Sequence, residues 1–185
     1  MQLTSPQDAG DKVIACFADG TCTVIVDLVI AADGIHSNIR HQFVGDGNPR
    51  YSGRIAYRGL FPLKEVESFW PFGSYSVSWL GKDKHFIVFP ISQNKTMNAV
   101  AFITTPEDQL GDLKESWTSV GKREELEKAY EGWDETLCKV IKCMDPNPAK
   151  WRLNDRVPLG QWTYMDGKAV LLGDAAHAML PHQGK

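Results

Sequence analysis

Two short apolar runs, each ending beside a glycine and an aspartate, constrain the fold of this chain more than any other feature. The first is the end of a longer apolar stretch and runs into Asp33-Gly34; the second, Ala169 to Leu172, runs into Gly173-Asp174. A buried strand that ends in such a turn and leads into a helix delivers polar groups to the carboxyl edge of an α/β sheet, where ligands bind. The pattern predicts two strand-turn-helix units, with phosphate or ribose as the natural ligand.

Composition excludes several classes of protein. The chain has 185 residues, 43% of them apolar, so it is long enough for one well-filled core or for parts of two domains. Its net charge is -3 without a basic block, which argues against nucleic acid as a partner. The longest apolar stretch, Val24 to Ala32, contains Asp27 and is too short to cross a bilayer, and the first residues lack the pattern of a signal peptide. We therefore expect a cytoplasmic protein without a membrane partner; the sequence leaves its oligomeric state open.

The four cysteines do not have metal-ligand spacing. Cys138 and Cys143 lie five positions apart, and no C-x-x-C pair occurs, so we expect no metal. Cys16 and Cys22 flank a turn, so a hairpin at this turn would allow them to face each other. In a reducing cytosol we expect them instead to be small buried hydrophobic residues.

The first part of the chain predicts a β-hairpin followed by a long strand and a short helix. Residues 13–17 and 22–34 are rich in β-forming side chains, and Asp19-Gly20 between them is typical of a tight turn. After Gly34, Ser37 or Asn38 is suited to cap a helix whose Ile39 and Phe43 lie four positions apart.

The middle of the chain predicts a mixed or antiparallel sheet followed by two helices. Strand patterns cover residues 54–63, 74–81, 85–92 and 97–105. Helical spacing then recurs, and Gly132 with Asp134 divides it into two helices, the second capped by Asp134. The apolar positions of these helices are Leu126, Ala129, Tyr130, Trp133, Leu137, Val140, Ile141 and Met144. Prolines in "DPNP" end the helical region, and residues 151–159 and 168–173 are expected to form a final pair of strands.

Each aspartate motif taken alone also has a purely structural explanation. Asp33-Gly34 is compatible with a simple turn, Ser37 with a helix cap and Arg40 with a solvated helix residue. His177, in apolar surroundings, is compatible with an ordinary core histidine.

Together, the two motifs resemble those of the class A flavin-dependent aromatic monooxygenases, in particular the salicylate hydroxylase-like members. The Asp-Gly motif of that family, with its following Ser and Arg, is matched by Asp33, Gly34, Ser37 and Arg40. The downstream Gly-Asp-Ala-Ala-His-x-x-x-Pro-x-x-Gly motif is matched by Gly173, Asp174, Ala175, Ala176, His177, Pro181 and Gly184. The two aspartates lie 141 residues apart, which leaves room for the sheet and helices that the family inserts between them.

This resemblance implies an α/β (mixed α+β) fold: a partial FAD-binding, Rossmann-like domain with an inserted mixed-sheet substrate domain, as in p-hydroxybenzoate hydroxylase. The expected boundaries are 1–48 and 156–185 for the FAD-binding part and 49–155 for the substrate domain. No G-x-G-x-x-G loop occurs in the sequence. We therefore expect a fragment that lacks the N-terminal FAD diphosphate loop and a C-terminal part, and that binds FAD weakly by itself.

The resemblance also implies roles for individual residues. Asp174 would bind the FAD ribityl chain, Asp33 would organise the diphosphate and the approach of the nicotinamide, and Pro181 would lie near the flavin ring. His182 would face the substrate phenol as the catalytic general base. The full cofactor-binding set is Asp33, Gly34, Arg40, Gly173, Asp174, Ala175, Pro181 and Gly184. The segment Tyr57-Arg58-Gly59 is similar to a strand of the family's middle domain, and Arg58 is left without an assigned catalytic role.

The implied activity is FAD-dependent hydroxylation of a phenolic aromatic acid such as salicylate, with NADH or NADPH and O₂. Two alternatives stay open at this stage. One is a hydroxylase of the same family that acts on a polyketide or terpenoid. The other is a catalytically inactive fragment.

Overall fold

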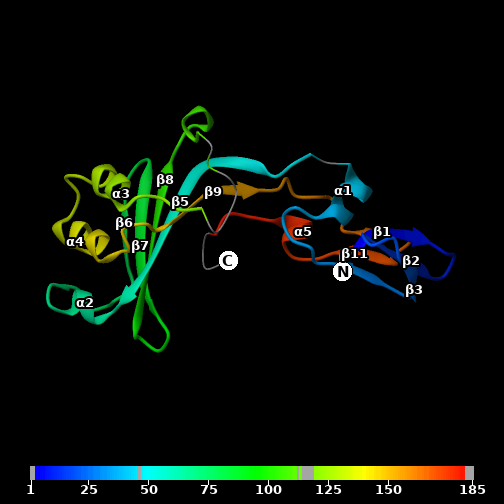
Figure 1. Ribbon diagram of the computed structural model, residues 1–185, viewed down its shortest axis with the longest axis horizontal. Coiled ribbons are helices and arrows are strands. Elements are labelled where there is room, and N and C mark those ends of the chain that lie inside the picture. Colours follow the sequence, from blue (N-terminus) through cyan, green and yellow to red (C-terminus); the bar gives the residue numbers. More distant parts are fainter. Residues whose placement is uncertain (1–2, 46, 112, 114–118, 182–185) are drawn as a thin grey trace. The chain divides into compact units, whose positions relative to one another are not determined.

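The computed structural model describes residues 3–45, 47–111, 113 and 119–181, and its contacts divide the chain into two compact units. The first unit combines Met1–Ser52 with Asn154–Lys185, and the second is Gly53–Leu153. Figure 1 shows the helices and strands of both.

In the first unit, a three-stranded antiparallel sheet has the order β1-β2-β3, formed by Leu3–Asp8, Val13–Phe17 and Cys22–Val26. The predicted hairpin joins β2 to β3. Gly20 in its turn has φ +84°, and the Asp19 carboxylate accepts from the backbone N–H of Thr21 at 3.0 Å. Strand β1 was not predicted, because it contains Pro6; as an edge strand it tolerates a residue without an N–H.

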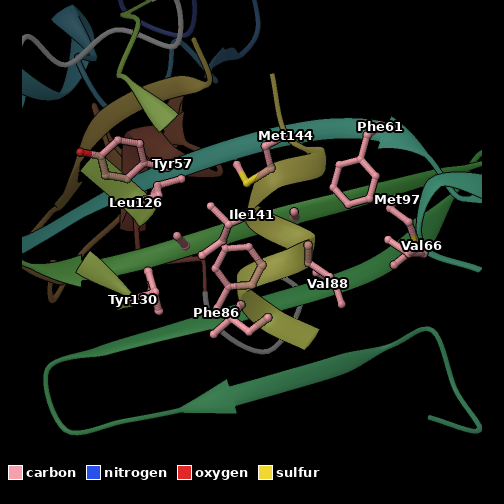
Figure 2. Packing of buried hydrophobic residues seen from close by; sticks show 14 of the residues in the cluster. Tyr57, Phe61, Val66, Phe86, Val88, Met97, Leu126, Tyr130, Ile141 and Met144 are labelled. Carbon is pink, nitrogen blue, oxygen red and sulfur yellow. The ribbon is translucent and has the colours of Figure 1, made fainter. Parts of the chain in front are cut away.

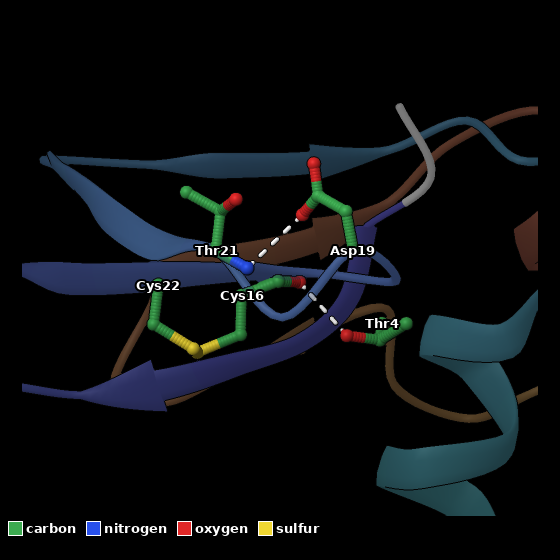
Figure 3. Close-up of a disulfide and its surroundings, with 5 residues drawn as sticks. All are labelled: Thr4, Cys16, Asp19, Thr21 and Cys22. Carbon is green, nitrogen blue, oxygen red and sulfur yellow. Dashed lines mark hydrogen bonds between the residues drawn. A yellow bond between two sulfur atoms is a disulfide. The ribbon is translucent and has the colours of Figure 1, made fainter.

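Cys16 and Cys22 form a disulfide across this hairpin, as Figure 3 shows. The expectation of two free, buried thiols was therefore wrong. The register pairs the two residues directly, and their Cα atoms lie 4.1 Å apart, which brings the side chains together. The Thr4 hydroxyl donates to the Cys16 carbonyl at 3.0 Å and ties β1 to the same place. Cys138 and Cys143 are free.

A second sheet in the same unit has the order β10-β11-β4, formed by Thr163–Tyr164, Ala169–Leu171 and Val29–Ala31. Strand β11 is antiparallel to β10 and parallel to β4. The long strand predicted over 22–34 is therefore two strands in two sheets. The division comes at Asp27-Leu28, where Asp27 pairs with Lys12 beside the first sheet and the chain leaves it to join β11. The short helices α1 (Asn38–Val44) and α5 (Asp174–His177) follow β4 and β11.

In the second unit, a five-stranded sheet has the order β6-β7-β8-β5-β9. Its strands are β5 (Arg50–Pro62), β6 (Val77–Leu80), β7 (Lys84–Ile91), β8 (Thr96–Thr104) and β9 (Ala149–Asp155). The predicted antiparallel pairing is confirmed for β6 with β7, β7 with β8, and β8 with β5. The predicted pairing of residues 151–159 with 168–173 is wrong. Strand β9 belongs to this sheet, beside β5, whereas β11 lies between β10 and β4 in the other sheet.

Helices α3 (Arg123–Ala129) and α4 (Glu135–Cys143) confirm the predicted helical region. Asp134 caps α4 by accepting from the Leu137 N–H at 3.1 Å, and Gly132 takes φ +77° between the helices. The remaining elements of this unit are the one-turn helix α2 (Lys64–Glu67) and the 3-10 turn η1 (Glu107–Gln109).

The core of the second unit lies between these helices and one face of its sheet, as Figure 2 shows. From α4, Leu137, Val140 and Ile141 are buried, and they share one cluster with Phe86 and Val88 of β7. The alternation of the strands sends every second side chain toward the helices.

Replacement of Ile141 by alanine tests this core. The side chain is buried, so its truncation leaves a cavity under α4 and is expected to lower the free energy of unfolding by about 2–4 kcal/mol. Urea denaturation followed by circular dichroism measures the loss. Lys142→Ala, at the exposed neighbouring position of the same helix, is the control and is expected to cost less than about 0.5 kcal/mol. Equal effects of the two changes would contradict the packing described.

Removal of the disulfide tests the hairpin. Because the cross-link closes a short loop, the Cys16→Ser/Cys22→Ser double variant is expected to lose about 2 kcal/mol of stability in protein purified without reductant. Urea denaturation with and without dithiothreitol measures this. Dithiothreitol is expected to lower the stability of the parent chain and of Cys143→Ser, which keeps the disulfide, and to leave the double variant unchanged. A parent chain indifferent to dithiothreitol would show that no disulfide is present.

Candidate functional site

The two aspartate motifs leave the same edge of one sheet. Strands β4 and β11 are parallel and in register, with Leu171 opposite Ala31, and the Leu172 N–H donates to the Ala31 carbonyl at 2.9 Å. Because carboxyl ends of parallel strands meet at one edge, Asp33 and Asp174 both follow this edge by two or three residues. The structure thus joins segments that lie far apart in the sequence.

In the first turn, the Asp33 carboxylate binds the beginning of α1. Its Oδ2 accepts from the backbone N–H groups of Asn38 at 3.0 Å and Ile39 at 3.4 Å. The Ser37 hydroxyl accepts from the Arg40 N–H at 2.9 Å, as the predicted cap requires. Gly34 has φ +82°, a conformation that favours glycine. Asp33 therefore holds a helix start and is itself exposed to a ligand.

The second turn leaves its aspartate unengaged. Gly173 has φ +61°, and a Cβ built on it would meet no atom within 4 Å, so a ligand has access to the main chain. The N–H groups of Ala176 and His177 both bond to the Gly173 carbonyl at 3.0 Å. Asp174 is exposed and makes no hydrogen bond or ion pair with any residue that the structure describes. Open main chain and a free carboxylate acceptor fit a hydroxylated cofactor such as FAD.

Arg40 connects the two turns. Its side chain is 1% exposed, and its guanidinium donates to the carbonyls of Ala175 at 3.3 Å, Ala176 at 2.9 Å and Val157 at 3.0 Å. The carbonyls of a helix as short as α5 lack hydrogen-bond donors within the helix, and the buried guanidinium of Arg40 supplies such donors. This geometry gives Arg40 a role in holding the second turn; its predicted contact with the cofactor stays a prediction.

Arg156, which precedes the second motif in the sequence, binds carbonyls near the first motif. It is 8% exposed, and it donates from Nε to the Ile35 carbonyl at 2.9 Å and from Nη1 to the Gly47 carbonyl. Its own N–H donates to the Ala178 carbonyl at 3.0 Å. Sequence reasoning missed Arg156, because it lies outside both motifs and one arginine in a strand-like segment carries no signal.

The other predicted site residues are placed as follows. Ala175 is fully buried, and its predicted contact with the cofactor stays a prediction, whereas Pro181 is exposed. The predicted catalytic residue His182 and the predicted cofactor residue Gly184 lie outside the described residues. His177 is half-buried and packs its ring against Trp162, with the centroids 5.0 Å apart.

In the second unit, the segment Tyr57-Arg58-Gly59 divides its side chains between the two faces of β5. Tyr57 joins the core under the helices, whereas Arg58 is exposed and donates from Nε to Oδ1 of Asn98 at 2.7 Å. Gly59 lies so close to Met144 that a Cβ would come within 2.7 Å of its Cε. Each of the three residues thus has a separate physical reason to be where it is.

Tyr57 belongs to a polar cluster that serves the packing of this unit. Its hydroxyl donates to Glu125 at 2.5 Å, and Lys150 donates to the same carboxylate oxygen at 2.8 Å. Burial, and then the hydrogen bond and charge of Glu125, raise the pKa of Tyr57. Burial opposes ionisation of Glu125, but the hydrogen bonds from Lys150 and Tyr57 outweigh it and lower the pKa of Glu125. The raised pKa keeps Tyr57 protonated at neutral pH, as its role of hydrogen-bond donor to Glu125 requires.

Two further features are absent from the described residues. They contain no group of three His, Cys, Asp or Glu side chains placed to hold a metal ion. None of their helices has the length and hydrophobicity that a membrane span needs.

Comparison with protein families gives a match to the model described as FAD binding domain, over residues 2–185. The chain is 35% identical to the 6-hydroxynicotinate 3-monooxygenase of Pseudomonas fluorescens, over 99% of this chain and 46% of that protein. It is also 35% identical to the salicylate hydroxylase of Pseudomonas putida, over 99% of this chain and 44% of that protein. The chain thus spans about half the length of the curated relatives it matches.

Among solved structures, a salicylate hydroxylase substrate complex matches with a TM-score of 0.82 and 28% identity, over 99% of this chain and 47% of that one. The structure of HpxO from Klebsiella pneumoniae with FAD and uric acid matches with a TM-score of 0.77 and 25% identity, over 99% of this chain and 44% of that one. The predicted combination of a partial FAD-binding domain with an inserted sheet domain is therefore confirmed as the fold.

Replacement of Arg40 by methionine tests the connection between the two turns. Loss of the buried guanidinium leaves three carbonyls without their donor, so the free energy of unfolding is expected to fall by about 2–4 kcal/mol. Chemical denaturation measures the change. Arg50→Met is the matched control, because Arg50 forms an exposed ion pair with Asp155 and its loss is expected to cost less than about 1 kcal/mol. An Arg40 variant as stable as the control would contradict the structural role.

Proposed function

The chain belongs to the FAD binding domain family, and on this premise we propose that it forms part of an FAD-dependent monooxygenase acting on a hydroxylated aromatic acid such as salicylate. The observation that carries the proposal is the parallel pairing of β4 with β11, which brings Asp33-Gly34 and Gly173-Asp174 to one sheet edge. Relatives named for salicylate, 6-hydroxynicotinate and 3-amino-4-hydroxybenzoate support an aromatic carboxylate as the substrate class.

In this proposal the residues of the first unit hold the cofactor. Asp174 would accept hydrogen bonds from the ribityl hydroxyls, and the open main chain at Gly173 would let the cofactor lie against it. Asp33 and Gly34 serve the diphosphate end indirectly, by fixing the beginning of α1. Arg40 keeps the second turn in place, and Pro181 and Gly184 are the residues that we assign to the flavin-ring end of the cofactor.

FAD, when bound, accepts a hydride from NADH or NADPH and activates O₂ for transfer of one oxygen atom to the ring. With salicylate, the complete reaction converts salicylate, NAD(P)H, O₂ and two protons to catechol, CO₂, water and NAD(P)⁺. The task of the protein is to bind the phenol, exclude water and remove the phenol proton. We assign that proton transfer to His182, with its imidazole as the base.

The proposal predicts that FAD binding depends on Asp174. Loss of a carboxylate that accepts from a ligand hydroxyl removes about 1.5–3 kcal/mol, so Asp174→Ala is expected to weaken FAD at least about tenfold. Titration of the chain into FAD, followed by flavin fluorescence, measures the affinity. Asp166→Asn is the control: Asp166 is exposed in a turn with φ +55°, which asparagine also adopts, and its change is expected to leave the affinity unaltered.

Two results would contradict the proposal. One is FAD affinity that is equal in the parent chain and in the Asp174 variant. The other is a chain that leaves flavin fluorescence unchanged at millimolar FAD. Product analysis by chromatography tests the proposed substrate. Formation of catechol from salicylate would distinguish a salicylate hydroxylase from a hydroxylase of polyketides or terpenoids.

A further inference from the structure

The five-stranded sheet carries a hydrogen-bonded pair of polar side chains, Arg58 and Asn98, on the face opposite its helices. On three neighbouring strands, every second side chain belongs to the core under α3 and α4. These side chains are Tyr57 and Phe61 of β5, Met97 and Ala99 of β8, and Phe86 and Val88 of β7. Successive side chains of a strand alternate between faces, so the residues between them project from the other side. That side, which we call the Arg58 face, consists of Arg58 and Leu60 of β5, Asn98 and Val100 of β8, and Ile87 and Phe89 of β7.

The strand register lays these residues out in two neighbouring rows. Leu60, Asn98 and Phe89 lie opposite one another in one row, and Arg58, Val100 and Ile87 in the next. Adjacent strands lie about 4.8 Å apart, so each row spans about 10 Å, wider than a single aromatic ring. Leu60 is 51% exposed and Phe89 is 37% exposed, which leaves apolar surface on both sides of the row.

Asn98 fixes the guanidinium of Arg58 on this apolar floor. It is 3% exposed, and its Oδ1 accepts from Nε of Arg58 at 2.7 Å. One donor of the guanidinium is thereby used, and the two terminal nitrogens present the fork that matches a carboxylate. No carboxylate among the described residues forms an ion pair with Arg58. An exposed arginine oriented by a buried amide, beside apolar side chains, is complementary to a ligand that is anionic at one end and aromatic at the other.

We propose that the Arg58 face binds a monocyclic aromatic carboxylate, with the carboxylate on Arg58 and the ring over Val100 and Ile87, beside the row of Leu60, Asn98 and Phe89. Arg58 is then the residue that determines selectivity for an acid over a neutral phenol. The inference rests on the proposed function for the identification of this ligand as the substrate, and it deepens that proposal by naming the recognising group.

Nuclear magnetic resonance of the ¹⁵N-labelled 185-residue chain tests the site directly. Sodium salicylate is expected to shift the Nε–Hε resonance of Arg58 and the side-chain amide of Asn98 in a saturable manner. Salicylamide, which lacks the charge, is expected to bind at least about tenfold more weakly. Arg58→Gln is expected to reduce salicylate affinity to the level of salicylamide, and Arg58→Lys to give an intermediate value.

Lys82→Gln is the matched control, because it removes the same charge from an exposed position in the turn between β6 and β7 of the same unit. It is expected to bind salicylate as the parent does. Phenol is expected to bind the parent chain and Arg58→Gln equally, which shows that the apolar floor of the variant is intact.

The inference is overturned if salicylate on the order of 10 mM leaves the Arg58 and Asn98 resonances unmoved, or if Arg58→Gln and Lys82→Gln bind it alike. It is also overturned if the shifts follow protein concentration instead of salicylate, which would mean that a second copy of the chain covers this face. These results are independent of the flavin titration. A chain that binds FAD but not salicylate at Arg58 refutes only this inference, whereas one that binds salicylate but not FAD refutes only the assignment of the cofactor site.

Discussion

The parallel pairing of β4 with β11 is the constraint on which the candidate cofactor site depends. The pairing covers only three residues on each strand, yet it sets the register of two turns whose aspartates lie 141 residues apart in the sequence. A shift of β11 by one residue would turn Leu171 from the buried face to the open one, and it would bring a residue with a side chain to the place where Gly173 has φ +61°. The buried packing of Ala31 and Leu171 with Ile39 and Ala176 therefore fixes the position of the site chemistry.

So short a strand pair needs support, and two arginines supply it. Arg40 comes from the first motif and binds carbonyls of the second; Arg156 comes from the chain before the second motif and binds carbonyls around the first. The partners named here are backbone carbonyls. Such bonds fix the path of the main chain, which is what a site built on exposed main chain requires. The arginine of the first motif is thus explained by the fold itself, without a ligand.

The sequence allowed the periodic elements and the caps to be predicted, since both depend on neighbouring residues. Ser37, Asp134 and the turn at Gly20 are where the local chemistry requires them. Strand partners were harder, because pairing is a property of distant segments: residues 22–34 have the composition of one strand, and the single charge of Asp27 within them did not reveal that the segment is divided between two sheets. The same holds for the site. The motif residues were found, whereas Arg156 and the bond of Asn98 to Arg58 exist only through contacts that no local pattern records.

Side chains of β5 alternate between the two faces of the sheet, so consecutive residues of one motif have different surroundings and different roles. Tyr57, Arg58 and Gly59 are consecutive, but the first is held in the core by Glu125, the second projects from the other face beside Asn98, and the third lacks a side chain because Met144 fills the space. Replacement of Tyr57 or Gly59 would disturb the packing under the helices, whereas replacement of Arg58 would remove the charge from an exposed apolar face together with the hydrogen bond to Asn98. Of the three, Arg58 is therefore the one whose side chain lies outside the core, and the bond to Asn98 uses only its Nε, so the terminal nitrogens of the guanidinium are the part that the proposed ligand would engage.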